Sequence, residues 1–192
     1  MQALPWLQTS LMPHLHPGNP IDSLQLTAIH GQTIDVPHSQ ALTHLQFRRF
    51  AGCPMCNLHI HSFVRRHDEL RRAGIQEVAV FHSSTADLLA QHAQAPFALI
   101  ADPRKALYRQ FGVEAGWRAV LDPRAWPAGV RGLLQYGLGL PGQGESMLGL
   151  PADFLIAPEG RVLAAHYGSH ADDQWSLDEL LALADRHRDR ER

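Results

Sequence analysis

The 192-residue chain contains very little cysteine: its only two thiols, Cys53 and Cys56, lie three positions apart. Two cysteines cannot form the disulfide framework of a small secreted domain, which needs several cysteine pairs. A close pair in an otherwise thiol-free chain instead indicates a functional pair in a reducing compartment.

The chain also lacks an excess of charge of one sign and any long hydrophobic run. Its 17 basic and 19 acidic residues give a formal net charge of -2, which excludes the basic surface typical of nucleic-acid binding. The longest uncharged, glycine-rich stretch, 132–144, is shorter than the roughly 20 apolar residues that span a bilayer. The first residues lack the basic stretch and apolar run of a signal peptide. We therefore expect a cytoplasmic protein with no nucleic-acid or membrane partner.

The first half of the chain predicts a leader segment, the start of one domain, and within it a hairpin, a strand and a helix. Residues 1–20 contain four prolines and no periodicity, so we expect an irregular leader before a single domain at 21–192. Apolar residues alternate with polar ones over 24–36 around a His-Gly turn, which predicts a β-hairpin. A strand at 42–50 is followed by the strongest helical periodicity of the chain, at 53–72.

The second half predicts strands that alternate with helices, which is typical of a parallel sheet covered on both faces. The expected elements are strands at 78–81 and 97–100, a helix capped by Ser84, a helix at 103–111, an antiparallel pair at 154–156 and 162–164, and a last helix at 177–186. Between them lies a glycine- and proline-rich insertion at about 113–150, with a short helix around 131–136. An insertion of this length is either a lid or binding loop, or a packed segment without a role.

The cysteine motif joins the strand at 42–50 to the helix that follows. A thiol in the first turn of a helix lies near unpaired backbone N–H groups and the positive end of the helix dipole, which favour the thiolate. Pro54 suits the first helical position because it has no N–H to leave unpaired. Helical spacing places Cys56 on the apolar stripe and Cys53 at the exposed tip. We therefore predict a catalytic dithiol in which Cys53 attacks and Cys56 resolves.

A zinc site is the main alternative use of these cysteines. Cys56 and Cys53 are close in sequence to His59 and His61, but structural zinc needs four ligands that converge tetrahedrally. His61 points away from the stripe that carries Cys56, so the set on this helix is incomplete. We expect no metal. We also expect no cofactor, since the glycine-rich segment 137–142 has no strand before it and no long helix after it.

Four other side chains near the motif can be assigned from their positions. Arg48 and Arg49 alternate along their strand, so at most one of them faces the thiols. His59 is interpreted as a surface histidine rather than a group that tunes the thiols, and His67, on the apolar stripe, as a hydrogen-bonded core histidine.

Three stretches of the chain, 47–56, 102–113 and 150–156, resemble the peroxiredoxin-like branch of the alkyl hydroperoxide reductase/thiol-specific antioxidant (AhpC/TSA) family. The resemblance covers roughly 24–183. It implies an α/β, thioredoxin-like fold: a central mixed sheet flanked by helices, with an N-terminal β-hairpin and an insertion before the C-terminal hairpin.

The resemblance also implies an enzyme, a thiol-dependent oxidoreductase with antioxidant activity. Its reductant would be a thiol of the thioredoxin or glutathione type and its substrate a disulfide or a peroxide. The resemblance also allows a homodimer. Pro151 is the expected counterpart of the cis-proline that faces the disulfide in thioredoxin folds. Together with Phe50 and Met55 it forms the expected substrate-binding set.

Two departures from the family pattern shape the functional hypothesis. Peroxidatic sites carry the signature Pro-x-x-x-Thr/Ser-x-x-Cys, and this chain has Gln46 and Phe50 at the matching positions. The second cysteine is three residues away rather than in a distant segment. The first hypothesis is therefore a thiol–disulfide oxidoreductase. The alternatives are a peroxidase for hydrogen or alkyl hydroperoxides, and a non-enzymatic redox sensor or metal-binding module.

Overall fold

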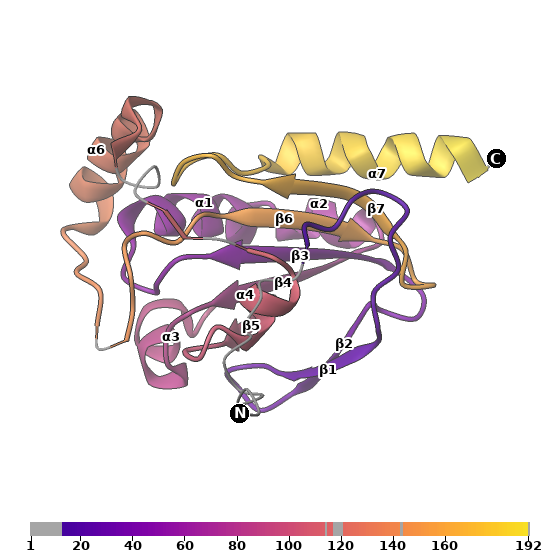
Figure 1. Ribbon diagram of the computed structural model, residues 1–192, viewed down its shortest axis with the longest axis horizontal. Helices are drawn as coiled ribbons and strands as arrows, with labels where there is room; N and C mark the ends of the chain where they lie inside the picture. Colours follow the sequence, from indigo (N-terminus) through magenta and orange to yellow (C-terminus); the bar gives the residue numbers. More distant parts are fainter. Residues whose placement is uncertain (1–12, 114, 117–120, 143, 192) are drawn as a thin grey trace, which may run out of the picture.

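The structure is a computed structural model that describes residues 13–113, 115–116, 121–142 and 144–191. Its centre is a five-stranded mixed sheet with the strand order β5-β4-β3-β6-β7 (Figure 1). The strands are β3 (Leu42–Arg48), β4 (Ile75–Phe81), β5 (Ala98–Ala101), β6 (Ala152–Ile156) and β7 (Val162–Tyr167). β3, β4 and β5 are parallel, whereas β6 is antiparallel to both β3 and β7. The predicted thioredoxin-like α/β fold is confirmed.

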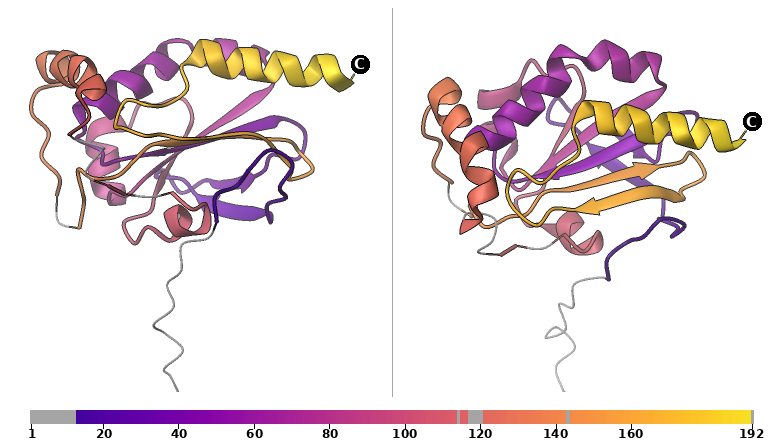
Figure 2. Two further views of the ribbon diagram at one scale, coloured as in Figure 1. Left: turned by 45° about the horizontal axis from the view of Figure 1, so that its top comes forward. Right: turned by 90° about the horizontal axis from the view of Figure 1, so that it is seen from above.

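Helices cover both faces of this sheet (Figure 2). The helices are α1 (Pro54–Arg65), α2 (His67–Arg72), α3 (Thr85–His92), α4 (Ala106–Gln110), α6 (Trp126–Tyr136) and α7 (Leu177–Glu191), with a 3-10 turn at Pro123–Ala125. α1, α2 and α7 lie on one face. The opposite face is covered by α4 and by a separate two-stranded hairpin, β1 (Leu24–Thr27) and β2 (Thr33–Val36).

Alternation along β3 supplies both faces of the core, and all seven residues of this central strand are buried. Leu45 and Phe47 belong to the apolar cluster beneath α4 and the hairpin. The side chains that alternate with these two along the strand are polar and point to the face that carries α1; they are His44, Gln46 and Arg48. The sheet therefore holds an apolar layer on one side and a polar group on the other.

Four helix boundaries differ from the sequence predictions. The helix predicted at 53–72 is interrupted at Arg66 (φ -115°, ψ 18°). The apolar residues before and after the break stay in phase, so the periodicity does not reveal it. α4 begins only at Ala106, because both Asp102 carboxylate oxygens accept N–H groups of its first turn. α6 begins five residues earlier than predicted, and α7 extends to Glu191.

Part of the predicted leader lies outside the described residues, namely 1–12. The remainder lies beside the start of β7: Gly18 N–H donates to the Val162 carbonyl at 2.8 Å, and Val162 N–H donates to the Asn19 carbonyl at 2.9 Å. In the part of the chain that the structure describes, no helix is both long and apolar enough to cross a bilayer.

Candidate active site

Cys53 is the N-cap residue of α1, with an extended backbone (φ -67°, ψ 116°). Its Sγ accepts a hydrogen bond from the backbone N–H of Cys56 at 3.3 Å. The sulfur thus takes the place that a serine or threonine oxygen usually occupies at a helix start, and Pro54 takes the first helical position as predicted. Both cysteines are free thiols. This arrangement presents a sulfur to the positive end of the helix dipole.

Arg49, the residue after β3, supplies a positive charge to the same sulfur. Its Nη2 donates to Cys53 Sγ at 2.9 Å, and its Nη1 donates to the Met147 carbonyl at 3.0 Å. Arg48 instead extends into the layer between the sheet and α1, where its Nη2 donates to Asp153 Oδ1, so Arg49 is the arginine that contacts Cys53. Sequence reasoning could not decide which arginine faces the thiols, because that depends on where the strand ends and the chain turns.

The two thiols titrate as one pair. Burial raises the pKa of Cys53, as does the hydrogen bond with Cys56, whereas Arg49 lowers it. Burial acts to raise the pKa of Cys56 too, but the hydrogen bond with Cys53 and the charge of Arg49 lower this pKa to about 6. The low value falls on Cys56, which is also hydrogen-bonded to Arg49, although Arg49 Nη2 and the Cys56 N–H both donate to Cys53 Sγ. Because the thiols are hydrogen-bonded, we assign the low pKa to the pair and place the negative charge on Cys53, where Arg49 and the N–H converge.

The prediction that Cys53 lies at an exposed tip is wrong. Its exposed fraction is 0%, and that of Cys56 is 3%. The reason is the insertion, from which α6 packs against α1 (Figure 1). We call residues 126–140, which comprise α6 and the segment after it, the cover. Helical periodicity describes one helix and contains no signal for a second segment that lies over its first turn.

Glycines let the cover approach the motif at backbone distance. A Cβ on Gly132 would lie 2.6 Å from the Pro54 carbonyl oxygen, and a Cβ on Gly139 would lie 1.6 Å from the Gly52 carbonyl oxygen. Side chains at these two positions would push the cover away, so the close fit requires glycine. The segment after the cover is held as well, because the Ser83 hydroxyl accepts the Ala51 N–H at 2.8 Å and donates to Glu145.

The predicted substrate-binding residues lie in different surroundings. Phe50 is buried in the apolar cluster that contains both cysteines, and Met55 packs against this cluster. Pro151 lies directly before β6 and packs against Gly168. Its peptide bond is trans, and the cis bond among the described residues is Val36–Pro37. The chain therefore enters β6 without the cis-proline that the resemblance implies, and pairs at once with β7.

The sequence model of the family described as AhpC/TSA antioxidant enzyme matches residues 62–170, which is more than half of the chain. The chain belongs to this family. The protein is thus a thiol-dependent oxidoreductase or peroxidase, and membership implies a thiol reductant and a peroxide substrate. The match begins after Cys56, so it does not itself include the dithiol. No curated protein sequence matches the chain.

Solved structures support the fold of this AhpC/TSA family member. AhpC of Mycobacterium tuberculosis is 17% identical with a TM-score of 0.66, over 93% of this chain and 96% of that one. The reduced 2-Cys peroxiredoxin of Plasmodium vivax is 14% identical with a TM-score of 0.66, over 92% of this chain and 84% of that one. Peroxiredoxin Q of Xanthomonas campestris is 21% identical with a TM-score of 0.60, over 85% and 90%.

A fully buried polar network lies between α1 and the sheet of this family member. Arg48 Nη2 donates to Asp153 Oδ1 at 2.5 Å, and Arg48 Nε donates to Gln46 Oε1 at 2.5 Å. His44 donates to Glu77 Oε2 at 2.7 Å and to Asp153 Oδ1 at 3.2 Å. Two carboxylates thus face two cations, so the charges balance in a region that excludes water.

The pKa values in the network follow from these pairings. Burial acts to lower the pKa of His44, but Glu77 and Asp153 raise it to about 9, so the ring is protonated at neutral pH. Burial acts to raise the pKa of Asp153, but Arg48 and His44 hold it well below its usual range. His44 and Asp153 are therefore both charged at neutral pH.

Three histidines considered at the sequence level now have definite environments. The interpretation of His59 as a surface residue is wrong: it is buried, and its Nε2 accepts from Arg48 Nη2 at 2.9 Å. Burial and the charge of Arg48 keep its pKa well below the usual value, so it is neutral. His61 stacks on Tyr136 of the cover at 5.0 Å between ring centroids, and His67 lies beside Phe97 at 5.8 Å. Across the described ranges, no group of three or more His, Cys, Asp or Glu side chains is arranged to hold a metal ion.

Proposed function

We propose that Cys53 and Cys56 are the redox-active dithiol of this enzyme, with Cys53 as the nucleophile and Cys56 as the resolving thiol. The observation that carries the proposal is the environment of Cys53 Sγ, which accepts hydrogen bonds from both Arg49 Nη2 and the Cys56 N–H. These donors favour a thiolate at the atom that must attack. Cys56 lies one helical turn away, within hydrogen-bond contact, where it can close a disulfide without large movement.

A hydroperoxide is the oxidising substrate that the geometry supports best. Cys53 is buried beneath the cover, so a small oxidant reaches it with less rearrangement than a disulfide in a folded protein would require. Phe50 stands where peroxidatic sites carry a hydroxyl, so the donor available to a bound peroxide is the Arg49 guanidinium. The site therefore relies on a cation where the family signature uses a hydroxyl group.

The proposed cycle is balanced in atoms and electrons. The Cys53 thiolate attacks the hydroperoxide; an S–O bond forms, the O–O bond breaks, and the alkoxide or hydroxide leaves with a proton as alcohol or water. The sulfur of Cys56 then attacks the sulfenic acid; the S–S bond forms, the S–O bond breaks, and water leaves. An external thiol reductant, of the thioredoxin or glutathione type, returns two electrons by thiol–disulfide exchange.

Thiol–disulfide exchange with a disulfide substrate is the second candidate, and two observations favour it. The missing hydroxyl at Phe50 removes one peroxide-binding group, and the two thiols are in contact within one Cys-Pro-Met-Cys motif. The same two sulfurs carry this reaction: Cys53 would form a mixed disulfide and Cys56 would release it. The two candidates thus share residues and differ in the first oxidant.

The test is stopped-flow measurement of thiol loss after addition of one equivalent of hydrogen peroxide, and separately of a small disulfide, to the reduced protein. Cys56→Ser should stop at a sulfenic acid that dimedone captures, whereas Cys53→Ser should react slowly, because it lacks the activated sulfur. Equal rates for Cys53→Ser and the unaltered protein would overturn the assignment of the nucleophile. Fast reaction with the disulfide alone would establish the second candidate. Reaction with neither would leave the sensor or metal-binding hypothesis.

A further inference from the structure

A cavity of about 400 Å³ lies at the carboxyl ends of the parallel strands. Its wall is formed by His82, Lys105, Tyr108, Arg109, Val113 and Gly149, together with Ala115, which pairs with Gly149. Neither cysteine lines it. In open α/β sheets, ligands bind outside the carboxyl ends of the strands where the strand order reverses, and β3, with parallel β4 on one side and antiparallel β6 on the other, marks such a point.

His82, directly after β4, is the least satisfied polar side chain of this wall. Its exposed fraction is 2%, and neither ring nitrogen has a hydrogen-bond partner among the described residues. Leaving a buried polar group unpaired costs about 1–3 kcal/mol. The neighbouring rings of Phe50 and Tyr108 lie 6.5 and 5.8 Å away between centroids, and the Tyr108 hydroxyl already donates to the Arg48 and Val80 carbonyls. A buried ring with two free nitrogens in a cavity wall is suited to bind a ligand.

Positive charge gathers beside this ring. Lys105 is the only lysine of the chain, and in the described part its ammonium has no hydrogen-bond or ion-pair partner. Its backbone is left-handed (φ 55°), which among the described residues no other non-glycine residue adopts. Arg109 Nη1 donates to the Arg104 carbonyl, and the Arg109 guanidinium has no carboxylate partner among the residues that the structure describes. The nearby Asp102 carboxylate is occupied by the N–H groups of Ala106 and Leu107.

The rest of the wall is apolar. The ring of Tyr108, the side chain of Val113 and the backbone of Gly149 line it, and a cavity of this volume lies within the range of small-molecule sites. Gly149 also separates the cavity from the dithiol, because a Cβ there would lie 3.3 Å from His82 Nε2 and 3.4 Å from Arg49 Cγ. The pocket therefore combines a cationic end with an apolar wall, directly behind the arginine that contacts Cys53.

We propose that this pocket binds an organic carboxylate with a hydrocarbon chain of medium length. The carboxylate accepts hydrogen bonds from the Lys105 ammonium, the Arg109 guanidinium and one N–H of His82, and the chain lies along Val113 and Tyr108. The proposal rests on the unpartnered groups of the pocket and does not depend on the reaction assigned to the cysteines. Failure of the peroxide assay would leave it standing.

The experiment is a titration of the full, reduced protein with sodium octanoate, in which binding is measured by calorimetry and by the NMR signals of the His82 ring. The ring signals are assigned by their loss in His82→Leu. The pKa of His82 is lowered to about 4 by burial and by Lys105, so a bound anion should raise it measurably. Octanol, which has the same chain without charge, and inorganic phosphate, which has charge without a chain, serve as the comparison ligands. We expect at least tenfold weaker binding of both.

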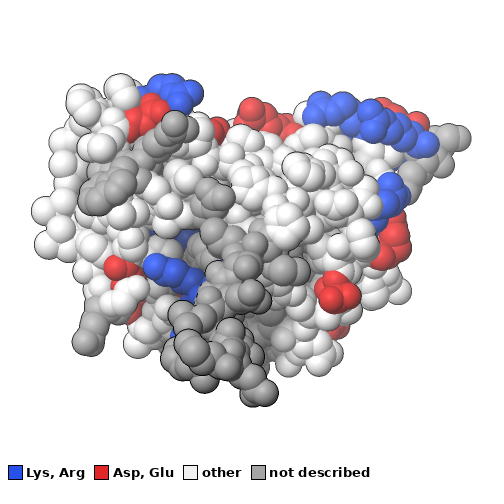
Figure 3. Space-filling model, in the orientation of Figure 1, with Lys and Arg blue, Asp and Glu red and all other residues white. Residues whose placement is uncertain are grey.

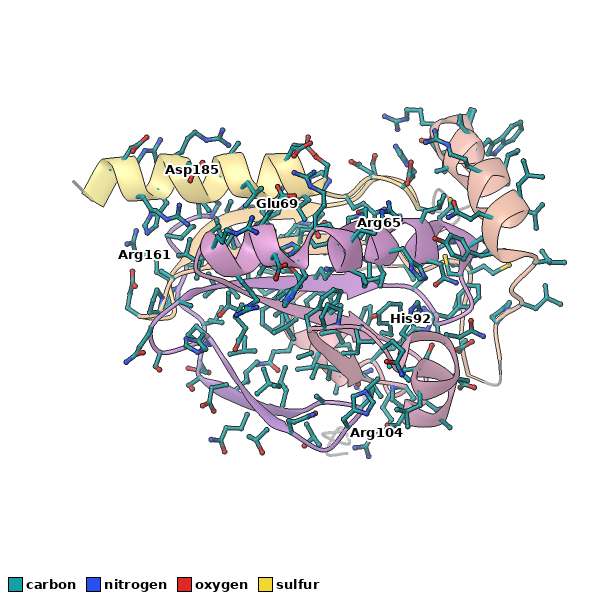
Figure 4. All side chains as sticks on the ribbon, turned by 180° about the vertical axis from the view of Figure 1, so that it is seen from behind. Arg65, Glu69, His92, Arg104, Arg161 and Asp185 are labelled. Carbon is teal, nitrogen blue, oxygen red and sulfur yellow. The ribbon has the colours of Figure 1, made fainter. Side chains whose placement is uncertain are left out.

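Lys105→Met should weaken octanoate binding at least tenfold, since it removes the cation and keeps an unbranched side chain. Arg104→Met is the matched control: it removes an equal charge from the neighbouring position, which does not line the pocket and lies at the outer edge of the molecule (Figure 4). A second readout needs no variant. Because the chain has a single lysine, acetylation followed by peptide mass spectrometry should show that octanoate protects Lys105. Equal binding of octanol or phosphate, unchanged affinity in Lys105→Met, or no protection would overturn the proposal.

Discussion

Replacement of Arg49 by methionine should raise the pKa of the dithiol, because Arg49 provides the cation that contacts the sulfur of Cys53 at 2.9 Å. A hydrogen bond to a charged group contributes about 1.5–3 kcal/mol. Since one pKa unit corresponds to about 1.4 kcal/mol, loss of this bond should move the first thiol titration upward by about 1–2 units. From the value of about 6 in the intact pair, the midpoint would reach roughly 7–8.

Two measurements follow this shift. The ultraviolet absorbance of the thiolate gives the midpoint directly, and the rate of alkylation by iodoacetamide across the pH range gives it independently. At neutral pH the thiolate fraction, and hence the alkylation rate, should fall roughly two- to tenfold in Arg49→Met. Arg49→Lys should lie between the two proteins, because it keeps the charge but cannot contact the sulfur and the Met147 carbonyl with two nitrogens at once.

The control is Arg65→Met, which removes an arginine from the last turn of the same helix. Arg65 is exposed and lies on the outer side of α1 (Figure 4), so its loss should leave the midpoint unchanged. Circular dichroism establishes that each variant is folded. If folded Arg49→Met titrates like the unaltered protein, the negative charge does not rest on the sulfur that Arg49 contacts, and the assignment of the nucleophile fails with it.

Three further predictions concern the cover and the buried network. Gly132→Val should displace the cover, since even a Cβ would lie 2.6 Å from a backbone oxygen, and should speed alkylation of the native thiols several-fold. Gly116→Val, where a Cβ meets nothing within 4 Å, should leave the alkylation rate unchanged; equal rates in the two variants would contradict the cover's role. Because the pKa of His44 is raised from 6.5 to about 9, its stabilisation is complete below 6.5 and lost as pH rises to about 9. Urea unfolding should show a loss of about 3 kcal/mol across that interval, measured with both cysteines replaced by serine because the thiols titrate there with the opposite sign; a flat profile would count against the ionised network. Arg48→Leu leaves buried carboxylates short of a cation and should cost about 3–5 kcal/mol of unfolding free energy, whereas exposed Arg161→Leu should cost little, so similar losses would refute the network's importance.

Local signals in the sequence were sufficient for the sheet and for the start of α1. The hairpin, the alternating strands and helices, and the cap at Ser84 each depend on side chains close in sequence, and the structure has all of them. The position of Cys53 at the helix start is of the same kind, because the end of the strand and Pro54 determine it. Features set by neighbouring residues are those that one sequence can predict.

The environment of the site depends on contacts between distant segments, and it was predicted less well. Cys53 is buried because a glycine 79 positions further along the chain allows the cover to pack there. His59 is on the buried face of α1, where Arg48, on a different element, donates to its Nε2. The unpartnered ring of His82 has no signature in sequence at all, since a histidine after a strand is equally compatible with solvent. Such features follow from packing and not from pattern.

The cover reconciles a buried thiol with an enzyme that must exchange electrons with an external reductant. The buried residues of α6 are Ala128 and Gly132, and its Tyr136 stacks on His61 of α1, so the helix buries few large apolar side chains. Its outer side carries exposed apolar residues, of which Leu134 is 83% exposed, and few charged side chains are visible over this edge of the molecule (Figure 3). Elements with few buried apolar contacts open at lower free energy than the core. We therefore expect the closed cover to keep water from the proposed thiolate while a small oxidant reacts, and to open when a Cys53–Cys56 disulfide meets a larger thiol.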